Sequence, residues 1–204
     1  MIRLPRRYAA GLLAALGVTV LLATATACGI RPTDVPVDAG PAPTRATCDA
    51  PPGEDSQDSE VFLVCGSHVN PVRRPLSLGA TAQDGAKIAG ALLSELQSAP
   101  GRNERDAGFT SEVPADLRVS GPVGGDPAGT LRLSERPAAL PATALVQIIC
   151  TFAANESLGD GWTVMLGGPP DGKQDRPKTY ACSTATRASP EEAQDTIRRR
   201  INGP

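Results

Sequence analysis

The chain is poor in the side chains on which most enzyme active sites depend. Its 204 residues include a single histidine, His68, and no Gly-x-Ser-x-Gly motif. A Ser-His-Asp arrangement needs a histidine beside the nucleophile, and His68 falls next to a predicted turn, where a surface position is favoured. A carboxylate pair is the remaining hydrolytic option. Its candidates lie in a polar connector where we expect them to be solvated: Glu104, Asp106, Glu112 and Asp116. We therefore expect no enzyme activity and no cofactor.

Metal-binding and nucleic-acid-binding signals are equally scarce. The five cysteines form no Cys-x-x-Cys pair, and His68 alone cannot complete the ligand set of a zinc site. After Ala27 the chain has 17 basic and 22 acidic residues, a net charge of −5. Nucleic-acid binding depends on clustered Lys and Arg that neutralise phosphates. The composition therefore makes the chain a poor candidate for either class, and we expect no metal and no nucleic acid.

The first 28 residues have the pattern of an export signal. Three arginines precede an uncharged run over residues 8–27, and small residues then lead into Cys28. This stretch resembles a bacterial lipoprotein signal with its lipobox, in which a peptidase accepts small side chains such as Ala25 and Ala27. Ala25 departs mildly from the leucine usual at that position. The resemblance implies cleavage between Ala27 and Cys28 and lipid attachment to Cys28.

The same stretch has two other interpretations. Twenty uncharged residues at about 1.5 Å each can span a bilayer as an uncleaved anchor, or an ordinary signal can be cut elsewhere. All three interpretations place the remainder outside the cytoplasm. We expect a lipid-anchored protein on the extracytoplasmic face of the cell membrane. Arg6-Arg7 leaves the Sec and twin-arginine export routes open.

Composition divides the mature chain into three parts. Residues 28–59 are rich in Pro, Asp, Gly and Ala without apolar periodicity, which is typical of a flexible tether. As a coil its 31 residues after Cys28 would extend about 30 Å, by ~5–6 Å × √n. Residues 60–185 have the periodicity of a folded domain, and residues 186–204 predict a C-terminal helix.

Four cysteines remain after Cys28, an even number that suggests two disulfides in an oxidising compartment. Three pairings are possible, and we favour Cys48 with Cys65 and Cys150 with Cys182. The second pair would close a loop of about 32 residues, which stabilises by on the order of 3–4 kcal/mol in the chain-entropy model.

The domain begins with a predicted hairpin and a helix. Residues 61–65 are β-rich, Gly66-Ser67 is a turn signal, and residues 68–74 alternate, with Pro71 favouring an edge strand. A helix follows over 84–98, capped by Asp84 and apolar on one face.

A second hairpin and helix follow. Residues 117–120 and 130–134 alternate about a Gly/Pro-rich loop, and residues 138–155 form a helix that is apolar on most sides, which predicts burial. Strands are predicted over 162–166 and 178–183. The order indicates an α+β fold: a mostly antiparallel sheet with two main helices on one face, plus a short C-terminal helix.

That C-terminal helix has a capping box at its start, Ser189-Pro190-Glu191-Glu192. Three arginines fall in its last turn, where the helix dipole favours cations. They are also candidate contacts to anionic lipid or an acidic partner: Arg198, Arg199 and Arg200.

Two helix-containing segments resemble the GerMN domain family of bacterial envelope lipoproteins. The resemblance covers about residues 60–170, and Ala99 replaces the usual glycine. It is carried by Leu92-Leu93, Leu96, Ala99-Pro100, Glu104, Gly108-Phe109, Thr110 and Pro114, by Gln147-Ile148-Ile149 with Thr151, and by Val72 and Arg73 after the turn. Cys65 and the segment from Cys150 to Cys182 look like additions. The resemblance implies a protein-interaction module, in some relatives beside a sensor kinase or a secretion assembly, without catalytic residues.

Two groups of residues are candidate contacts. Gln147 and Thr151 lie one turn apart on the apolar helix, where they either bind neighbouring backbone or contact a partner or ligand. Phe109, Phe152, Trp162 and Tyr180 could line a pocket, although we expect them in the core.

The function expected from all this is a non-enzymatic, membrane-anchored protein-interaction module of the cell envelope with an unidentified envelope partner. The alternatives are a small-molecule sensor and, less favoured, an envelope hydrolase.

Overall fold

The computed structural model describes residues 46–49, 58–76, 84–170 and 176–191. These residues belong to one unit, which begins at Thr44. The lipobox with Ala27 and Cys28, most of the tether, and Arg198 to Arg200 lie outside the described residues. Among the described residues, no helix has the length and apolar content needed to cross a bilayer.

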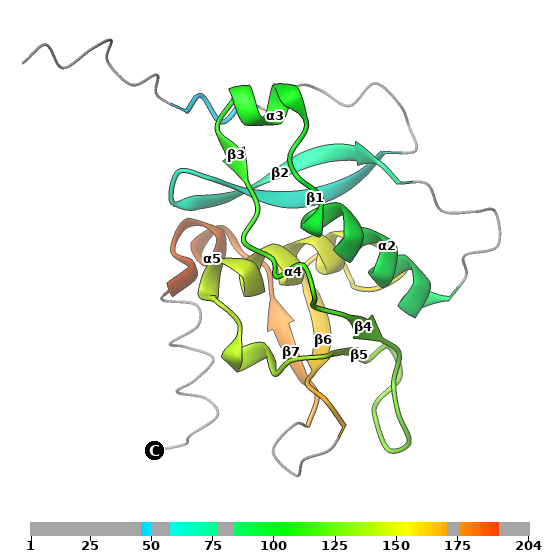
Figure 1. Cartoon of the computed structure of the whole chain (residues 1–204). Coiled ribbons are helices and arrows are strands. Elements are labelled where there is room, and N and C mark those ends of the chain that lie inside the picture. The colour runs from blue at the N-terminus through cyan, green and yellow to red at the C-terminus, as the bar shows by residue number, and fades with distance from the viewer. Residues whose placement is uncertain (1–45, 50–57, 77–83, 171–175, 192–204) are drawn as a thin grey trace, which may run out of the picture. The chain divides into compact units, whose positions relative to one another are not determined.

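The first sheet is built on the predicted hairpin, which is confirmed. Strands β1 (Asp58–Cys65) and β2 (His68–Pro75) pair in antiparallel register through a turn in which Gly66 has φ +64°. Strand β3 (Phe109–Thr110) pairs with the other side of β1, giving the order β2-β1-β3 (Figure 1). Pro71 therefore lies in an edge strand, as its missing N–H requires.

Helix α2 (Gly85–Gln97) matches the predicted helix closely. The Asp84 side chain accepts a hydrogen bond from the Ala86 N–H at 3.0 Å, which satisfies one of the unpaired donors at the helix start. Its apolar stripe is buried: Ile88, Leu92, Leu93 and Leu96. Burying a leucine side chain contributes roughly 1.5–3 kcal/mol, so this face fixes α2 on the core.

The second sheet has the order β4-β5-β6-β7. It consists of β4 (Val119–Ser120), β5 (Leu131–Leu133), β6 (Thr163–Gly167) and β7 (Lys178–Ala181). The β4/β5 and β6/β7 pairs are antiparallel, as the predicted hairpin requires, whereas β5 and β6 are parallel. Parallel strands need a long crossover connection, and the segment between them contains a helix that provides it.

Helix α4 (Ala142–Ala154) is that crossover, and it occupies the core. It contacts β1 and β2 of the first sheet and β6 and β7 of the second, as well as α2 (Figure 1). The predicted burial is confirmed, since only Thr143 and Ala154 escape full burial. The helix begins later than expected because Pro137–Ala139 form a separate 3-10 turn, η1, and Pro141 is the N-cap.

The α+β class is confirmed, but the arrangement differs from the expectation of one sheet with helices on one face. The strands form two sheets, one of which contains a parallel pair, and α2 and α4 each contact strands of both. The predicted alternation specified the strands and the two hairpins but not how the hairpins and the later strands combine into sheets. Strand pairing depends on contacts between distant parts of the chain, which local periodicity does not encode.

Two short helices complete the described chain. Helix α3 (Arg102–Asp106) lies in the segment expected to be a connector. Helix α5 (Thr184–Ala188) precedes the predicted C-terminal helix and is capped by the Ser183 side chain, which accepts from the Thr186 N–H at 3.0 Å. Pro190 and Glu191 are helical, and the continuation of that predicted helix lies outside the described residues.

The structure contains two disulfides in the pairing that the sequence analysis favoured. Cys48 is bonded to Cys65 and Cys150 to Cys182, with Cα–Cα separations of 5.7 and 4.9 Å. The Cys48 N–H also donates to the Ala107 carbonyl oxygen at 3.1 Å. The end of the tether is thereby fixed to the folded domain.

A buried ion pair fixes the Gly/Pro-rich loop before β5. Arg132 donates two hydrogen bonds to the Asp126 carboxylate, each 2.7 Å long, and a third to the Gly168 carbonyl oxygen at 2.6 Å. Hydrogen bonding by Arg132 lowers the pKa of Asp126 to about 2. The burial of Arg132 and its pairing with Asp126 were not predicted from the sequence.

Candidate interaction site at Trp162

The two polar candidates on α4 are fully buried and bind backbone. The Phe62 N–H donates to Thr151 Oγ1 at 2.9 Å, and Gln147 Nε2 donates to the Phe62 carbonyl oxygen at 3.0 Å. Gln147 Oε1 also accepts from the Glu112 N–H at 2.9 Å. Both side chains have 0% exposure, and of the two roles expected for them the structure shows the hydrogen bonds to backbone and not a surface position from which to contact a partner. They stabilise the attachment of β1 to the core helix.

The strand pairing in the first sheet explains why Gln147 and Thr151 bind the backbone of Phe62. Phe62 lies opposite Pro71, which has no N–H, and β3 pairs only with Val64 and Cys65. The backbone groups of Phe62 therefore have no strand partner on the β3 side. Unpaired buried backbone groups are costly, and the amide of Gln147 and the hydroxyl of Thr151 satisfy them.

One of the carboxylates considered for hydrolysis, Glu104, is bound within the fold. Glu104 is buried rather than solvated: Arg74 donates two hydrogen bonds to it, at 2.9 and 2.6 Å, and the Gly101 N–H donates a third. Burial alone would raise the pKa of Glu104, but the hydrogen bonds from Arg74 and Gly101 outweigh it, and the pKa is lowered. An ionised carboxylate with three donors has a structural role and is a poor general acid.

The other candidate groups are exposed. Asp106, Glu112 and Asp116 lie at the surface, as does His68, whose Nδ1 lies 3.3 Å from the Ser67 hydroxyl. Within the described ranges no three His, Cys, Asp or Glu side chains lie close enough to hold a metal ion.

Trp162 is the most unusual surface residue of the described chain. Its exposure is 70%, and Val123, at 39%, is the other large apolar side chain exposed among the described residues. The sequence placed Trp162 with the core aromatic residues, and this prediction is wrong, whereas Phe109, Phe152 and Tyr180 are buried as expected. An exposed tryptophan forfeits the burial that normally stabilises an aromatic side chain.

The backbone around Trp162 is rigidly held. Asp160 Oδ1 accepts hydrogen bonds from the N–H groups of Trp162 and Thr163 at 2.9 and 2.6 Å, and these bonds lower the pKa of Asp160. The Trp162 carbonyl oxygen accepts from the Cys182 N–H at 2.7 Å, and the Gly161 N–H donates to the Ala153 carbonyl oxygen at 2.9 Å. The backbone that carries the indole is thus held next to the Cys150–Cys182 disulfide.

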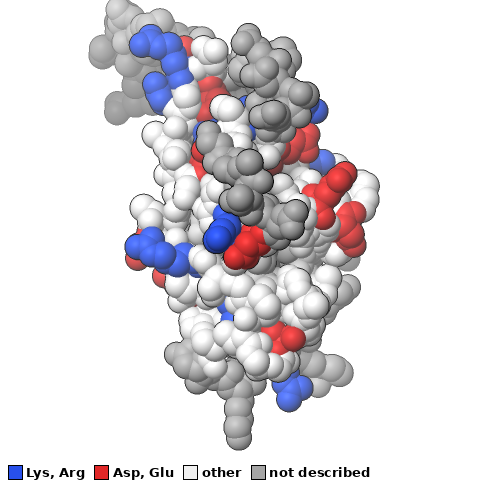
Figure 2. Space-filling view, turned by 90° about the vertical axis from the view of Figure 1, so that its right-hand side faces the viewer, with Lys and Arg blue, Asp and Glu red and all other residues white. Residues whose placement is uncertain are grey.

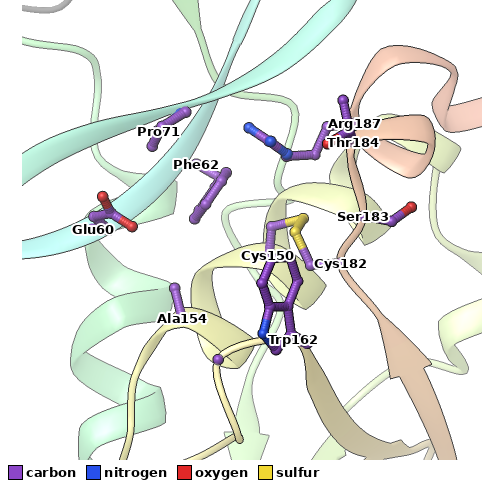
Figure 3. A pocket seen from close by; sticks show the side chains of 11 residues that line it. Glu60, Phe62, Pro71, Cys150, Ala154, Trp162, Cys182, Ser183, Thr184 and Arg187 are labelled. Atoms are coloured by element: carbon purple, nitrogen blue, oxygen red, sulfur yellow. A yellow bond between two sulfur atoms is a disulfide. The ribbon is translucent and has the colours of Figure 1, made fainter.

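Trp162 lies at the rim of a hollow of about 210 Å³ (Figure 3). Three elements meet there: the β1/β2 hairpin, the end of α4 and the start of α5. The hollow is lined by Glu60, Phe62, Pro71, Cys150, Ala154, Gly161, Trp162, Cys182, Ser183, Thr184 and Arg187. Its volume is below the roughly 300–1,000 Å³ of pockets for drug-sized ligands, and suits one large side chain or one ring.

Opposite charges flank the hollow. Figure 3 shows Glu60 and Arg187 on opposite sides of Phe62. The Arg187 guanidinium carbon lies 5.7 Å from the centre of the Phe62 ring, a cation–π contact. No carboxylate of the described chain forms an ion pair with Arg187, and Glu60 has no ion-pair partner there either, although Arg73 lies opposite it in register. On the face seen in Figure 2, basic and acidic side chains are interspersed.

The hollow brings together residues that the sequence analysis named separately. Cys150 and Cys182 were predicted as a disulfide and Trp162 as a core residue, whereas Glu60 and Arg187 were not singled out. A signal existed in the loop before β6: Asp160 two residues before Trp162 predicts a turn, and an aromatic residue in a turn is more exposed than one within a strand.

Comparisons with protein-family models, with curated proteins and with solved structures found no match for this chain.

Proposed function

We propose that the protein is a non-enzymatic interaction module of the cell envelope, anchored through a lipid on Cys28 to the extracytoplasmic face of the membrane. Its partner would be an envelope protein that contacts the surface around Trp162. Cys28 and the segment of residues 1–27 carry the anchoring part of the proposal, through their likeness to a lipoprotein signal.

An interaction role is supported by one contrast: the buried polar side chains form hydrogen bonds within the fold, whereas the large apolar side chain of Trp162 is exposed. The polar groups of Gln147, Thr151 and Glu104 bind atoms of the fold itself. The exposed indole of Trp162 has no such role, although its backbone is fixed. Tryptophan and arginine are the residues most enriched at the energetic centres of protein interfaces, and Arg187 lines the same hollow.

We propose further that the domain is GerMN-like. In its favour, the residues that carried the resemblance have structural roles here. Glu104 caps α3 and pairs with Arg74, and Gly108 has φ +93° at a point where a Cβ atom would lie 2.4 Å from that of Ala46. Gln147 and Thr151 hold β1 on α4.

A small-molecule sensor is the second candidate function. The hollow of about 210 Å³ supports it, because it combines an apolar floor with two charged groups. Its small size and open rim favour a protruding side chain of a partner over an enclosed ligand.

The proposal is tested by crosslinking the full chain in living cells and identifying what is attached to it. We expect acylated Cys28 and an envelope protein, and the Cys28→Ser variant should lose both membrane attachment and partner. An intact Met1 with unmodified Cys28 in a cytosolic fraction would overturn the anchoring. Recovery of no protein, with a small molecule that raises the melting temperature, would favour the sensor.

A further inference from the structure

The hollow beside Trp162 has the features of a receptor for one anchoring side chain. Its floor includes the Phe62 ring and the Cys150–Cys182 disulfide, and Trp162 stands at its rim (Figure 3). Its volume of about 210 Å³ is of the size of one large apolar side chain. Interface energy concentrates where such an anchor fills a pocket surrounded by polar contacts.

The edge of the neighbouring sheet makes strand addition unfavourable as a way of binding. Backbone groups in an antiparallel pair point alternately toward and away from the partner strand. Because the groups of Phe62 bind α4, those of its partner Pro71 point away from β1, toward the open edge of β2. Pro75 lies four residues after Pro71, so its backbone faces the same edge. Neither proline has an N–H that could donate to an added strand. Two of the backbone donors along this edge are thus missing, which favours recognition through side chains.

The charges at the two sides of the hollow specify the partner further. Glu60 offers an unpaired carboxylate on one side of Phe62, and Arg187 an unpaired guanidinium on the other, within the described chain. Complementary charges orient a bound segment, and a like charge at either position is costly. A neutral or uniformly charged ligand would use at most one of the two groups.

We infer that the hollow binds a polypeptide segment of the partner in which one apolar or aromatic side chain is flanked by a basic residue on one side and an acidic residue on the other. The apolar side chain packs against Trp162, Phe62 and the disulfide. The basic residue pairs with Glu60 and the acidic residue with Arg187. This inference rests on the proposed function, since it names the surface and the chemistry through which the interaction takes place.

The first test locates the contact. A photo-crosslinking amino acid is placed at Thr184, which lines the hollow, or at Val123 as a matched exposed control, in the full chain in its native host. We expect a protein adduct from Thr184 and at least several-fold less from Val123. Sequencing of the attached peptide should reveal an apolar residue with a basic and an acidic residue beside it. A protein adduct from Val123 alone would overturn this hollow as the contact surface while leaving the proposed interaction with an envelope protein intact, whereas no protein adduct at either position would contradict both.

The second test measures the charge pattern. A synthetic copy of the captured segment is titrated into the full chain, with the fluorescence of Trp162, the chain's single tryptophan, as the readout. Glu60→Lys and Arg187→Glu should each weaken binding at least ten-fold, and a peptide with its two charges exchanged should bind the double variant better than the original. Equal binding by original and exchanged peptides would overturn the proposal. So would a captured saccharide or lipid in place of a peptide.

Discussion

The core of the molecule contains polar side chains, and its surface carries an exposed tryptophan. Both positions are unusual, but hydrogen bonds within the fold explain only the polar side chains. Gln147 and Thr151 lie on a buried helix, but each of them binds the backbone of β1. Trp162 lies at the surface with an exposure of 70%, so the fold buries little of its side chain. The same contrast separates the charged groups: Arg74 and Glu104 are paired inside, while Glu60 and Arg187 line the hollow without an ion-pair partner among the described residues.

This comparison separates residues that the fold requires from residues that it does not require. A buried polar group without a partner destabilises a protein, so its partners explain its presence. The contacts of the fold give no such explanation for the exposed Trp162, and the proposed binding role would supply one. The predictions below test the two sides of the comparison, beginning with the largest expected effect.

Breaking the interior ion pair should destabilise the domain most. Arg74→Met leaves the Glu104 carboxylate buried without its main partner, which typically costs about 3–5 kcal/mol in the free energy of unfolding. The matched double variant Arg74→Met/Glu104→Leu should recover most of that loss. Urea denaturation of the three proteins measures this. Equal stability of the single and double variants would show that the buried charge is not the cause.

Removing the link between α4 and β1 should have the next largest effect. Thr151→Val preserves the shape of the side chain but leaves the Phe62 N–H without an acceptor, and a buried unsatisfied donor costs roughly 1–3 kcal/mol. Thr143→Val, on the same helix but partly exposed, is the control and should change stability little. The two unfolding free energies can be compared directly. If they agree, the bond to Phe62 does not contribute.

Much of the local structure was predictable, because its signals are local. The hairpin over 58–75 follows from alternation about Gly66-Ser67, and the two main helices follow from apolar stripes with a cap or a proline at the start. The parallel pairing of β5 with β6 was missed because it depends on a crossover, not on a pattern within either strand. Arg132 was missed for a similar reason, since Asp126 lies in a loop and not in the strand.

The candidate site was harder to predict than the fold. A tryptophan adjoining a β-rich segment is by default expected in the core, and only the turn at Asp160 moves Trp162 outward. Glu60 and Arg187 are 127 residues apart in the sequence, and β1 and α5 bring them to one hollow. No spacing or motif connects them, so their association could not be inferred without the structure.

Acid should weaken the interior ion pairs in a defined range of pH. The pKa of Asp126 is about 2 in the folded chain, below its ordinary value of 3.8, because Arg132 binds the ionised form. Its stabilising contribution is therefore complete above about pH 4 and is lost as the pH falls toward 2. Asp126→Asn should flatten the dependence of the urea midpoint on pH in this range. An unchanged slope in the variant would contradict the assignment.

The smallest effect on stability is expected at the surface. Trp162→Ala should change the free energy of unfolding by no more than about 0.5 kcal/mol, as for most surface substitutions. The control is Phe152→Ala in the core, which should cost about 3–5 kcal/mol. Calorimetry of both variants provides the comparison. A loss at Trp162 that approached the loss at Phe152 would assign the indole to the fold.

The most direct measurement of the central claim is the solvent accessibility of Trp162 in the native envelope. Hydroxyl-radical footprinting of the full chain in intact envelopes and after purification reports this, with the exposed Val123 as an internal reference. We predict that Trp162 is oxidised several-fold more slowly in envelopes, while Val123 reacts at the same rate in both. Equal oxidation of Trp162 in the two samples would contradict the claim that a partner covers it.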